Sequence, residues 1–164
     1  LKKHFEFKRV DGIDISNNNI EYCKSQILES NFYKNNGVDL SELESNTYDF
    51  VMSTIVFQHI PVHEIRYGLM SEILRILKEG GEFRFQMGYG EDLKHYKGGL
   101  DRKGYFDNYY NAEGTNGVRD VRITNENDII SDLEKIGFSN VKTQIKDSYS
   151  DDGHPSWIYI NCTK

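Results

Sequence analysis

The sequence predicts an α/β fold, with a doubly wound, mostly parallel sheet that ends in an antiparallel β-hairpin. Short apolar segments alternate with amphipathic helical segments up to about residue 87, as in sheets built from β-α-β units. The segment 48–57 is apolar along most of its length, which is typical of a parallel strand covered on both faces. Two strand-like segments follow the last helix directly, and such a short connection favours an antiparallel pair.

The first half of the chain begins with a short strand that ends on a carboxylate, Asp14. Ser16 is suited to cap the next helix, because its hydroxyl can accept an unpaired backbone N–H, and this helix is expected to run to about Ser30. A turn signal at 35–37 precedes the short apolar-containing segment 38–40, which is the candidate for the next strand. With the strand at 48–57, the order of elements is that of a parallel sheet.

The second half begins with a long helix, expected from Pro61 to the pair Gly80-Gly81, and a strand over 82–87 follows. Residues 88–123 contain seven glycines and five tyrosines, which indicates an insertion above the sheet. The last helix is expected to be capped by Thr124 or Asn125 and to stop at Gly137; the two hairpin strands lie at 140–146 and 157–162.

Composition excludes several classes of partner. The net charge of −6 and the pI near 5.4 argue against nucleic acid and against an anionic membrane surface. No apolar run approaches the roughly 20 residues that span a bilayer. The two cysteines, Cys23 and Cys162, fit reduced thiols in a cytoplasmic protein. Because the chain begins with Leu1, we expect a piece of a longer product or a processed form of it.

Three segments resemble the class I S-adenosylmethionine-dependent methyltransferases, from their second strand to their C-terminus. Residues 12–16 resemble the acid-tipped second strand of that family. Residues 48–61 resemble its fourth strand and the following loop, and residues 73–83 resemble the helix, glycine turn and fifth strand. The resemblance covers nearly the whole chain and implies a Rossmann-like sheet, S-adenosylmethionine as cofactor and a small-molecule acceptor.

The family's first strand and glycine-rich loop have no counterpart here. The expectation is therefore a single domain over 1–164 that is truncated at its N-terminus, with the insertion at about 88–123. Loss of a central strand leaves its two neighbours with unpaired edges. These edges can pair with each other, with residues 1–9 or with another chain, so a homodimer through strand edges is one expected arrangement.

The resemblance also assigns cofactor contacts. Asp14 would accept the ribose hydroxyls, since a carboxylate offers only acceptors, and Ile15 would pack against the adenine. The alternatives are a simple helix cap and an ordinary core residue. The turn at residues 36–40 would line the adenine edge, or be a plain turn, and the end of the fourth strand would meet the amino-acid moiety. These two groups comprise Asn36, Gly37, Val38, Asp39 and Leu40, and Ser53 and Thr54.

His59 is the candidate catalytic residue, because a neutral imidazole can take a proton from the acceptor. The alternative is a histidine that only binds a loop carbonyl. Gln86, Tyr105 and Tyr109 are candidate substrate contacts; equally, the insertion tyrosines could form a small core of their own. No metal site is predicted, since His59 and His63 lack a third ligand.

The function expected from these residues is methyl transfer from S-adenosylmethionine to a small molecule, with activity of this chain by itself left open. The alternative is a catalytically silent domain that keeps the fold for binding or oligomerisation. A nicotinamide-dependent dehydrogenase shares the ribose acid, but the antiparallel hairpin and the absent Gly-x-Gly-x-x-Gly motif disfavour it.

Overall fold

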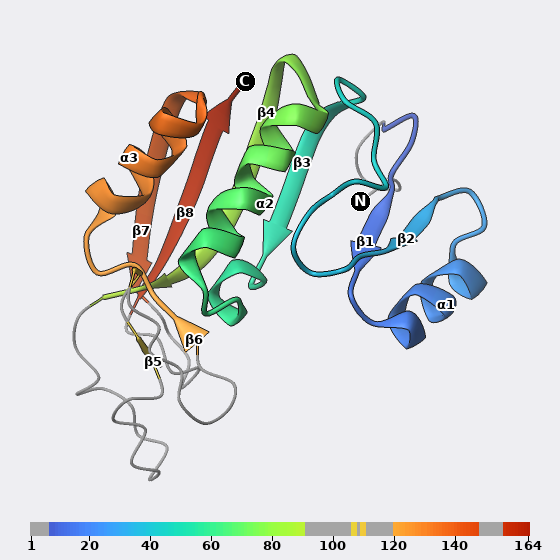
Figure 1. Ribbon diagram of the computed structural model, residues 1–164, viewed down its shortest axis with the longest axis horizontal. Helices are drawn as coiled ribbons and strands as arrows, with labels where there is room; N and C mark the ends of the chain where they lie inside the picture. The colour runs from blue at the N-terminus through green and yellow to red at the C-terminus, as the bar shows by residue number, and fades with distance from the viewer. Residues whose placement is uncertain (1–6, 91–105, 108, 111–119, 148–155) are drawn as a thin grey trace, which may run out of the picture. The chain divides into compact units, whose positions relative to one another are not determined.

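The computed structural model describes residues 7–90, 106–107, 109–110, 120–147 and 156–164. Contacts divide the chain into two compact units, residues 1–43 and residues 44–164, which are described separately. Figure 1 shows the elements of both.

Unit 1 (residues 1–43) is a β-α-β element. Strand β1 (Gly12–Asp14) pairs in parallel with β2 (Phe32–Lys34), and helix α1 (Asn17–Gln26) connects them. The predicted cap is confirmed, because the Ser16 hydroxyl accepts the backbone N–H of Asn19 at 3.3 Å. A parallel pair with a helical connection places both strand ends at the same edge.

Two expectations for unit 1 are wrong. Helix α1 ends at Gln26 rather than near Ser30: Ile27 leaves helical geometry with φ −133°, and Leu28 is 89% exposed. An exposed leucine gives the helix no packing to extend it. The second strand, β2, lies before the predicted turn, whereas residues 38–40 lie in irregular structure after it.

Unit 2 (residues 44–164) contains a four-stranded sheet in the order β3-β4-β8-β7. Strand β3 (Tyr48–Thr54) runs parallel to β4 (Leu77–Tyr89), whereas β8 (Ser156–Thr163) is antiparallel to both β4 and β7 (Ser139–Asp147). The predicted C-terminal antiparallel hairpin is thus confirmed. Two short strands, β5 (Phe106–Asp107) and β6 (Asp120–Val121), pair with each other in parallel.

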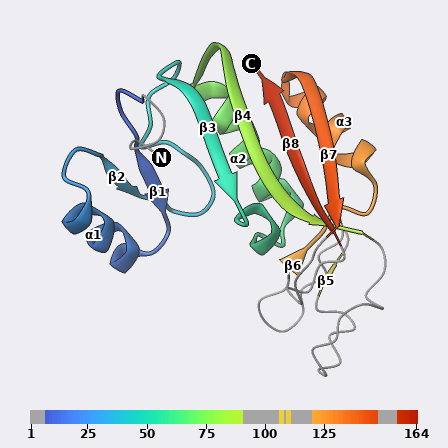
Figure 2. The same ribbon diagram turned by 180° about the vertical axis from the view of Figure 1, so that it is seen from behind.

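Two helices cover one face of this sheet. Helices α2 (His63–Ile76) and α3 (Glu126–Ile136) both lie in front of it in Figure 1, and the view from behind in Figure 2 shows the sheet in front of both. Alternate residues of β4 and β8 point into the core beneath them, which is the expected period of a half-buried strand. The core includes Leu69, Met70, Ile73, Phe83, Phe85, Met87, Ile129, Leu133, Ile158, Ile160 and Cys162.

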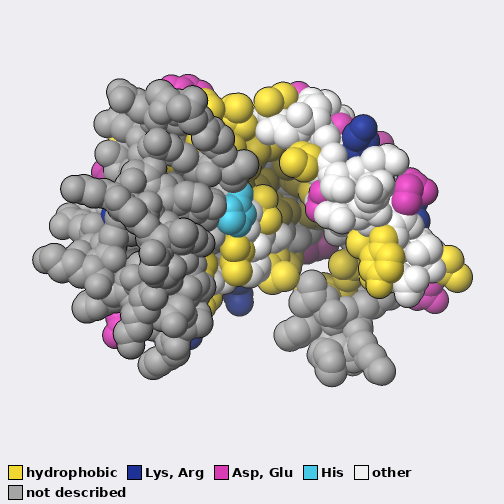
Figure 3. Space-filling view, turned by 90° about the horizontal axis from the view of Figure 1, so that it is seen from below, with side chains coloured by type: hydrophobic (Ala, Val, Ile, Leu, Met, Phe, Trp, Pro, Cys, Tyr) yellow, Lys and Arg dark blue, Asp and Glu magenta, His cyan; other side chains and the backbone are white. Residues whose placement is uncertain are grey.

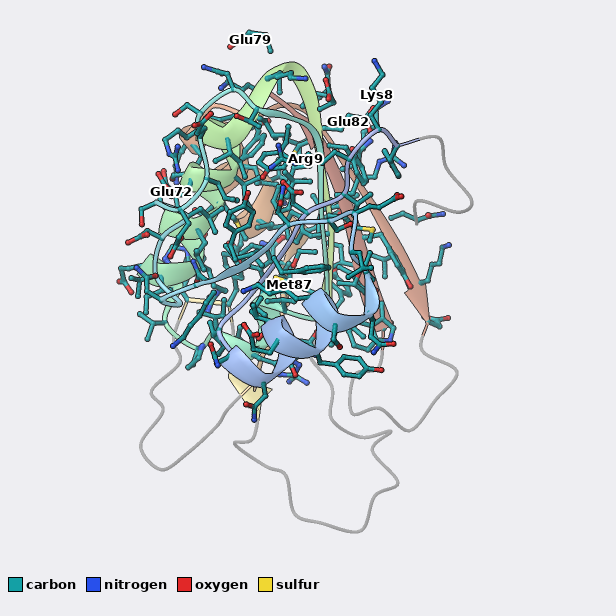
Figure 4. The ribbon with its side chains drawn as sticks, turned by 90° about the vertical axis from the view of Figure 1, so that its right-hand side faces the viewer. Lys8, Arg9, Glu72, Glu79, Glu82 and Met87 are labelled. Atoms are coloured by element: carbon teal, nitrogen blue, oxygen red, sulfur yellow. The ribbon has the colours of Figure 1, made fainter. Side chains whose placement is uncertain are left out.

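The boundary between α2 and β4 differs from the prediction. Helix α2 begins at His63, not Pro61, and ends at Ile76 rather than at the glycine pair. Leu77 already has extended geometry (φ −69°, ψ 144°) and is fully buried, so the chain passes directly from helix into strand. Gly80 lies inside β4 with φ 74°. Figure 4 labels Glu79 and Glu82 near one end of this long strand and Met87 toward the other.

The last helix behaves as predicted at both ends. The Asn125 side chain accepts the backbone N–H of Asn127 at 3.1 Å. Gly137 adopts a left-handed conformation (φ 117°), and its N–H donates to the carbonyls of Leu133 and Glu134 at 3.1 Å each. The α/β class is therefore confirmed. No ladder joins β1 to β3 within the described residues, and no described helix is long and apolar enough to cross a membrane.

A pair of glycine substitutions tests these helix assignments. Gly137→Ala should lower the free energy of unfolding by about 1–2 kcal/mol, because an L-residue is strained at this φ and its Cβ would lie 3.2 Å from Leu74. Gly68→Ala, inside α2 with nothing within 4 Å of the added Cβ, should raise it by roughly 0.5–1 kcal/mol. Urea unfolding measures both; changes of the same sign would contradict the assignments.

The two thiols should differ in reactivity. Burial raises the pKa of Cys162 to about 12, so at pH 8 only about one molecule in ten thousand carries the thiolate there. Cys23 is only half-buried. With a chromogenic disulfide reagent the native chain should release one equivalent promptly and the second only in denaturant. Two equivalents released at similar rates from the folded chain would refute this packing.

Candidate functional site

Asp14 lies at the C-terminal end of β1, where its carboxylate caps the start of α1. Its Oδ1 accepts the backbone N–H of Ser16 at 2.7 Å, and its Oδ2 accepts the side-chain amide of Asn19 at 3.2 Å. An ionised carboxylate offers about four lone-pair sites. Two of them therefore hold the carboxylate in place, and the remaining acceptor capacity suits a diol.

The turn after β2 is held by asparagine side chains. Asn36 Oδ1 accepts the N–H groups of Val38 and Asp39 at 2.8 and 3.1 Å, and its amide donates to Asp39 Oδ2 at 2.9 Å. The buried Asn35 donates to the Asp39 carbonyl and accepts the N–H of Gly37 at 2.6 Å, where φ is 85°. Bonds of this kind, between side chains and backbone groups of the same turn, fix its conformation locally.

Apolar side chains flank these polar groups. Ile15 and Val38 are 68% and 49% exposed, and a Cβ added at Gly37 would lie 3.7 Å from Ile15 Cγ2. Leu40, by contrast, is buried, so its side chain does not line an open surface. Unit 1 thus brings the Asp14 carboxylate and the exposed Ile15 to the end of its parallel strands, where α/β sheets bind ligands. A carboxylate can accept the hydroxyl groups of a diol, and an exposed apolar side chain can pack on a flat ring.

In unit 2, the loop after β3 has a strained start. Ser53 is half-buried and Thr54 exposed, at the end of the strand. Ile55 follows with φ 56°, which is a genuine outlier for a β-branched residue and costs about 1–3 kcal/mol. Strain of this kind concentrates at functional segments, where the surrounding structure enforces it.

His59 ends the short 3-10 helix η1 (Phe57–His59) and is exposed. The ring of Phe57 is buried, and its centroid lies 6.0 Å from that of Phe83 and 5.5 Å from that of Phe85. This contact packs η1 against the sheet. The N–H of His59 donates to the Val56 carbonyl at 3.0 Å. Figure 3 looks onto the end of unit 2 toward which β3 runs, and hydrophobic side chains gather in its described part. An exposed imidazole on a fixed backbone can exchange a proton with a ligand.

Gln86 lines a groove on the face of the sheet opposite α2 and α3. Register places Thr54 beside Gln86, and Gln86 beside Tyr159. The groove therefore brings together the predicted Ser53, Thr54 and Gln86, but it does not include His59. Its lining residues are Met52, Ser53, Thr54, Arg84, Phe85, Gln86, Lys142, Thr143, Gln144, Tyr159, Ile160 and Asn161.

The predictions for the tyrosines of the insertion have different outcomes. Tyr105 lies outside the described residues. Tyr109 is 1% exposed and its hydroxyl donates to Asp132 Oδ2 at 2.9 Å, so its side chain faces the interior. This placement corrects its expected role as a substrate contact, and it also differs from a small core formed by the insertion alone, because the partners of Tyr109 include Arg66 of α2 and Asp132 of α3. Tyr110 is 43% exposed, with its ring centroid 4.8 Å from that of His63.

Tyr109 belongs to a buried polar cluster of Arg66, His63, Tyr109 and Asp132. His63 Nε2 lies 2.7 Å from Asp132 Oδ2, and the Arg66 guanidinium lies 5.0 Å from the centroid of the Tyr109 ring. Desolvation lowers the pKa of Arg66 against the opposing field of Tyr109 and Asp132. Desolvation, reinforced by the Asp132 charge, raises the pKa of Tyr109, so this phenol stays protonated and donates.

Sequence reasoning missed Arg66 and Asp132 of this cluster, and it missed Asn19 as a partner of Asp14. A signal existed for Arg66, which occupies the same helical face as Leu69, Met70 and Ile73, at spacings of three, four and seven. A charge on a buried stripe needs partners. Asn19, in the first turn of α1, and Asn35, directly after β2, carried no such signal, because polar residues at such positions are ordinary.

Similarity to known proteins agrees with this geometry. Residues 1–85 match the methyltransferase domain family. Over 145 residues the chain is 30% identical to phosphoethanolamine N-methyltransferase 2 of Caenorhabditis elegans, an alignment that covers 82% of this chain and 28% of that protein. The chain thus spans little more than a quarter of this curated relative.

Solved structures share the fold. A SAM-dependent methyltransferase from Methanosarcina mazei matches with a TM-score of 0.72 at 18% identity, over 95% of this chain and 82% of that one. Phosphoethanolamine N-methyltransferase 2 from Haemonchus contortus, in complex with S-adenosyl-L-methionine, matches with a TM-score of 0.63 at 18% identity, over 95% and 43%.

The family match covers 85 of 164 residues and includes both sides of the boundary between the two units. The resemblance to S-adenosylmethionine-dependent methyltransferases is confirmed by these relatives, and the predicted enzyme class and cofactor agree with them. The chain belongs to the methyltransferase domain family.

Proposed function

We propose that this chain serves S-adenosylmethionine-dependent methyl transfer to a small-molecule acceptor. The observation that carries the proposal is the end of unit 1, where the fixed Asp14 carboxylate lies beside the exposed Ile15. That combination fits a nucleoside, because the carboxylate accepts hydroxyl groups while the apolar surface packs on a base. The family membership selects a methyl donor among nucleoside cofactors.

Each residue has a defined task in this proposal. S-adenosylmethionine, when bound, supplies an electrophilic methyl group on a sulfonium. Asp14 accepts the ribose hydroxyls, and the turn at Asn36 to Asp39 borders the adenine. His59 takes the proton that a nitrogen or oxygen acceptor loses. Ser53 and Thr54 border the amino-acid part, and Gln86 contacts the acceptor. Since transfer is an in-line displacement, alignment provides much of the rate.

Phosphoethanolamine is the first acceptor to test, because the relative from Caenorhabditis elegans is named for it. An amine of this kind must be unprotonated to attack a methyl carbon. In the proposal, His59 is the base that takes this proton. The acceptor and the activity of this chain by itself are both part of the proposal, as the chain spans 28% of that relative.

A silent binding domain is the second candidate. It is favoured by the bonds that Asp14 already makes within the α1 cap. The homodimer through strand edges stays a prediction within this candidate: in the described part of unit 2, β3 is an end strand of its sheet.

Location in the cytoplasm also stays a prediction.

Asp14 provides the test of cofactor binding. Asp14→Ala should weaken binding of S-adenosylhomocysteine by roughly 10- to 100-fold, since hydrogen bonds to a charged group contribute about 1.5–3 kcal/mol. Ser16→Ala is the matched control: it removes the cap hydroxyl that accepts from Asn19 but keeps the carboxylate. Titration calorimetry on the full chain measures both. Equal losses in the two variants, or no binding by the unmodified chain, would favour the silent domain.

His59 provides the test of catalysis. His59→Gln should lower kcat for phosphoethanolamine by about 100-fold or more, because an amide cannot act as the base. Binding of S-adenosylhomocysteine should stay within twofold of the unmodified chain, which separates catalysis from folding. A radiolabelled methyl-transfer assay measures the rate. An unchanged kcat would exclude His59 as the base.

A further inference from the structure

Arg66 is a fully buried charge that joins two loops of unit 2. It lies in the first turn of α2 with no exposed surface. Its Nη1 donates to the carbonyls of Ile60 and of Pro61, the latter at 2.9 Å, and its Nη2 donates to the carbonyl of Tyr109. One planar guanidinium therefore holds the segment directly after His59 and the insertion at the same time.

The side chain of Tyr109 extends this link to α3. Its ring lies under the Arg66 guanidinium, and its hydroxyl donates to Asp132, which also contacts His63 of α2. Asp132 is 3% exposed, so the positive charge of Arg66 is buried together with a carboxylate. Among the described residues, the cluster thus connects α2, α3, the loop at 60–61 and the insertion.

Stability alone does not explain this arrangement. A buried charge costs several kcal/mol in desolvation, and apolar side chains of similar volume are often as stable in its place. Among the residues that the structure describes, the Nε of Arg66 also has no hydrogen-bond partner. What the guanidinium supplies, and an apolar side chain cannot, is a fixed direction and distance between the carbonyls of Ile60 and Tyr109.

We infer that Arg66 is a positioning residue, which sets the loop that carries His59 at a fixed place relative to Tyr109 of the insertion. This inference rests on the proposed function, in which His59 acts on the acceptor. The loop at 56–60 is closed by backbone bonds from His59 to Val56 and from Ile60 to Phe57. The hydrogen bond from Arg66 to the Ile60 carbonyl therefore also restrains the backbone of His59, one residue away.

Hydrogen exchange of the full chain, followed by mass spectrometry, tests the link without any ligand. In Arg66→Met, peptides that contain residues 56–62 and residue 109 should exchange at least about tenfold faster together, while peptides from β8 keep their protection. Arg75→Met is the matched control: this arginine lies on the same helix but binds Glu72 and Ser45, so neither segment should change. Faster exchange in only one segment, or equally in β8, would overturn the inference.

Kinetics distinguish positioning from simple support. Arg66→Lys keeps the charge but cannot reach separate carbonyls with a rigid fork, so kcat for phosphoethanolamine should fall at least tenfold with an unchanged KM for S-adenosylmethionine. A kcat equal to that of the unmodified chain would overturn the inference. Absence of methyl transfer in the unmodified chain would count against the proposed function instead, and the exchange result would then decide the link by itself.

Discussion

The pairing of β4 on both of its edges is the constraint on which unit 2 depends. This 13-residue strand runs parallel to β3 and antiparallel to β8, and its buried side packs beneath α2. The β3 ladder places Thr54 opposite Gln86 and thereby fixes where the following loop begins. The ring of Phe57 packs on Phe83 and Phe85 of β4, so this strand also holds the loop through a side-chain contact. These two attachments hold the start of the loop that carries His59, and the bonds of Arg66 to Ile60 and Pro61 hold its end.

Buried polar groups complement this apolar framework rather than compete with it. Hydrophobic packing is non-directional and tolerates many arrangements of similar volume, whereas hydrogen bonds to carbonyls specify one. In unit 2 the sheet and the two helices form the apolar core, and the loops above it are held by Arg66, Tyr109 and Asp132. The strained φ of Ile55 lies in the same region. Irregular backbone here is stabilised by contacts from several elements at once.

In the proposed function, one carboxylate of unit 1 serves both structure and ligand. The bonds from Ser16 and Asn19 orient Asp14 before any ligand arrives, which reduces the entropy lost on binding. The same principle applies to the turn at Asn35 and Asn36, whose side chains satisfy its backbone groups internally. A helix cap and a ligand contact are therefore compatible functions of Asp14.

The sequence by itself determined the features that depend on local chemistry. The caps at Ser16 and Asn125, the stop at Gly137 and the antiparallel hairpin follow from side-chain hydrogen bonds, glycine geometry and alternation within a few residues. The helix ends that carry no such signal were predicted at the wrong residues. Helix α1 ends at Gln26, and α2 is followed directly by β4 at Leu77 because that residue is buried in the sheet.

Only the tertiary structure decided which side chains meet. Arg66, Tyr109 and Asp132 are separated by 43 and 23 residues, and no local pattern relates them. The burial of Tyr109, which had been expected at an open pocket, and the groove that joins Gln86 to Thr54 likewise result from the packing of distant segments. Local patterns specify elements, but long-range contacts are specified by the complementarity of whole surfaces, which a single sequence does not display.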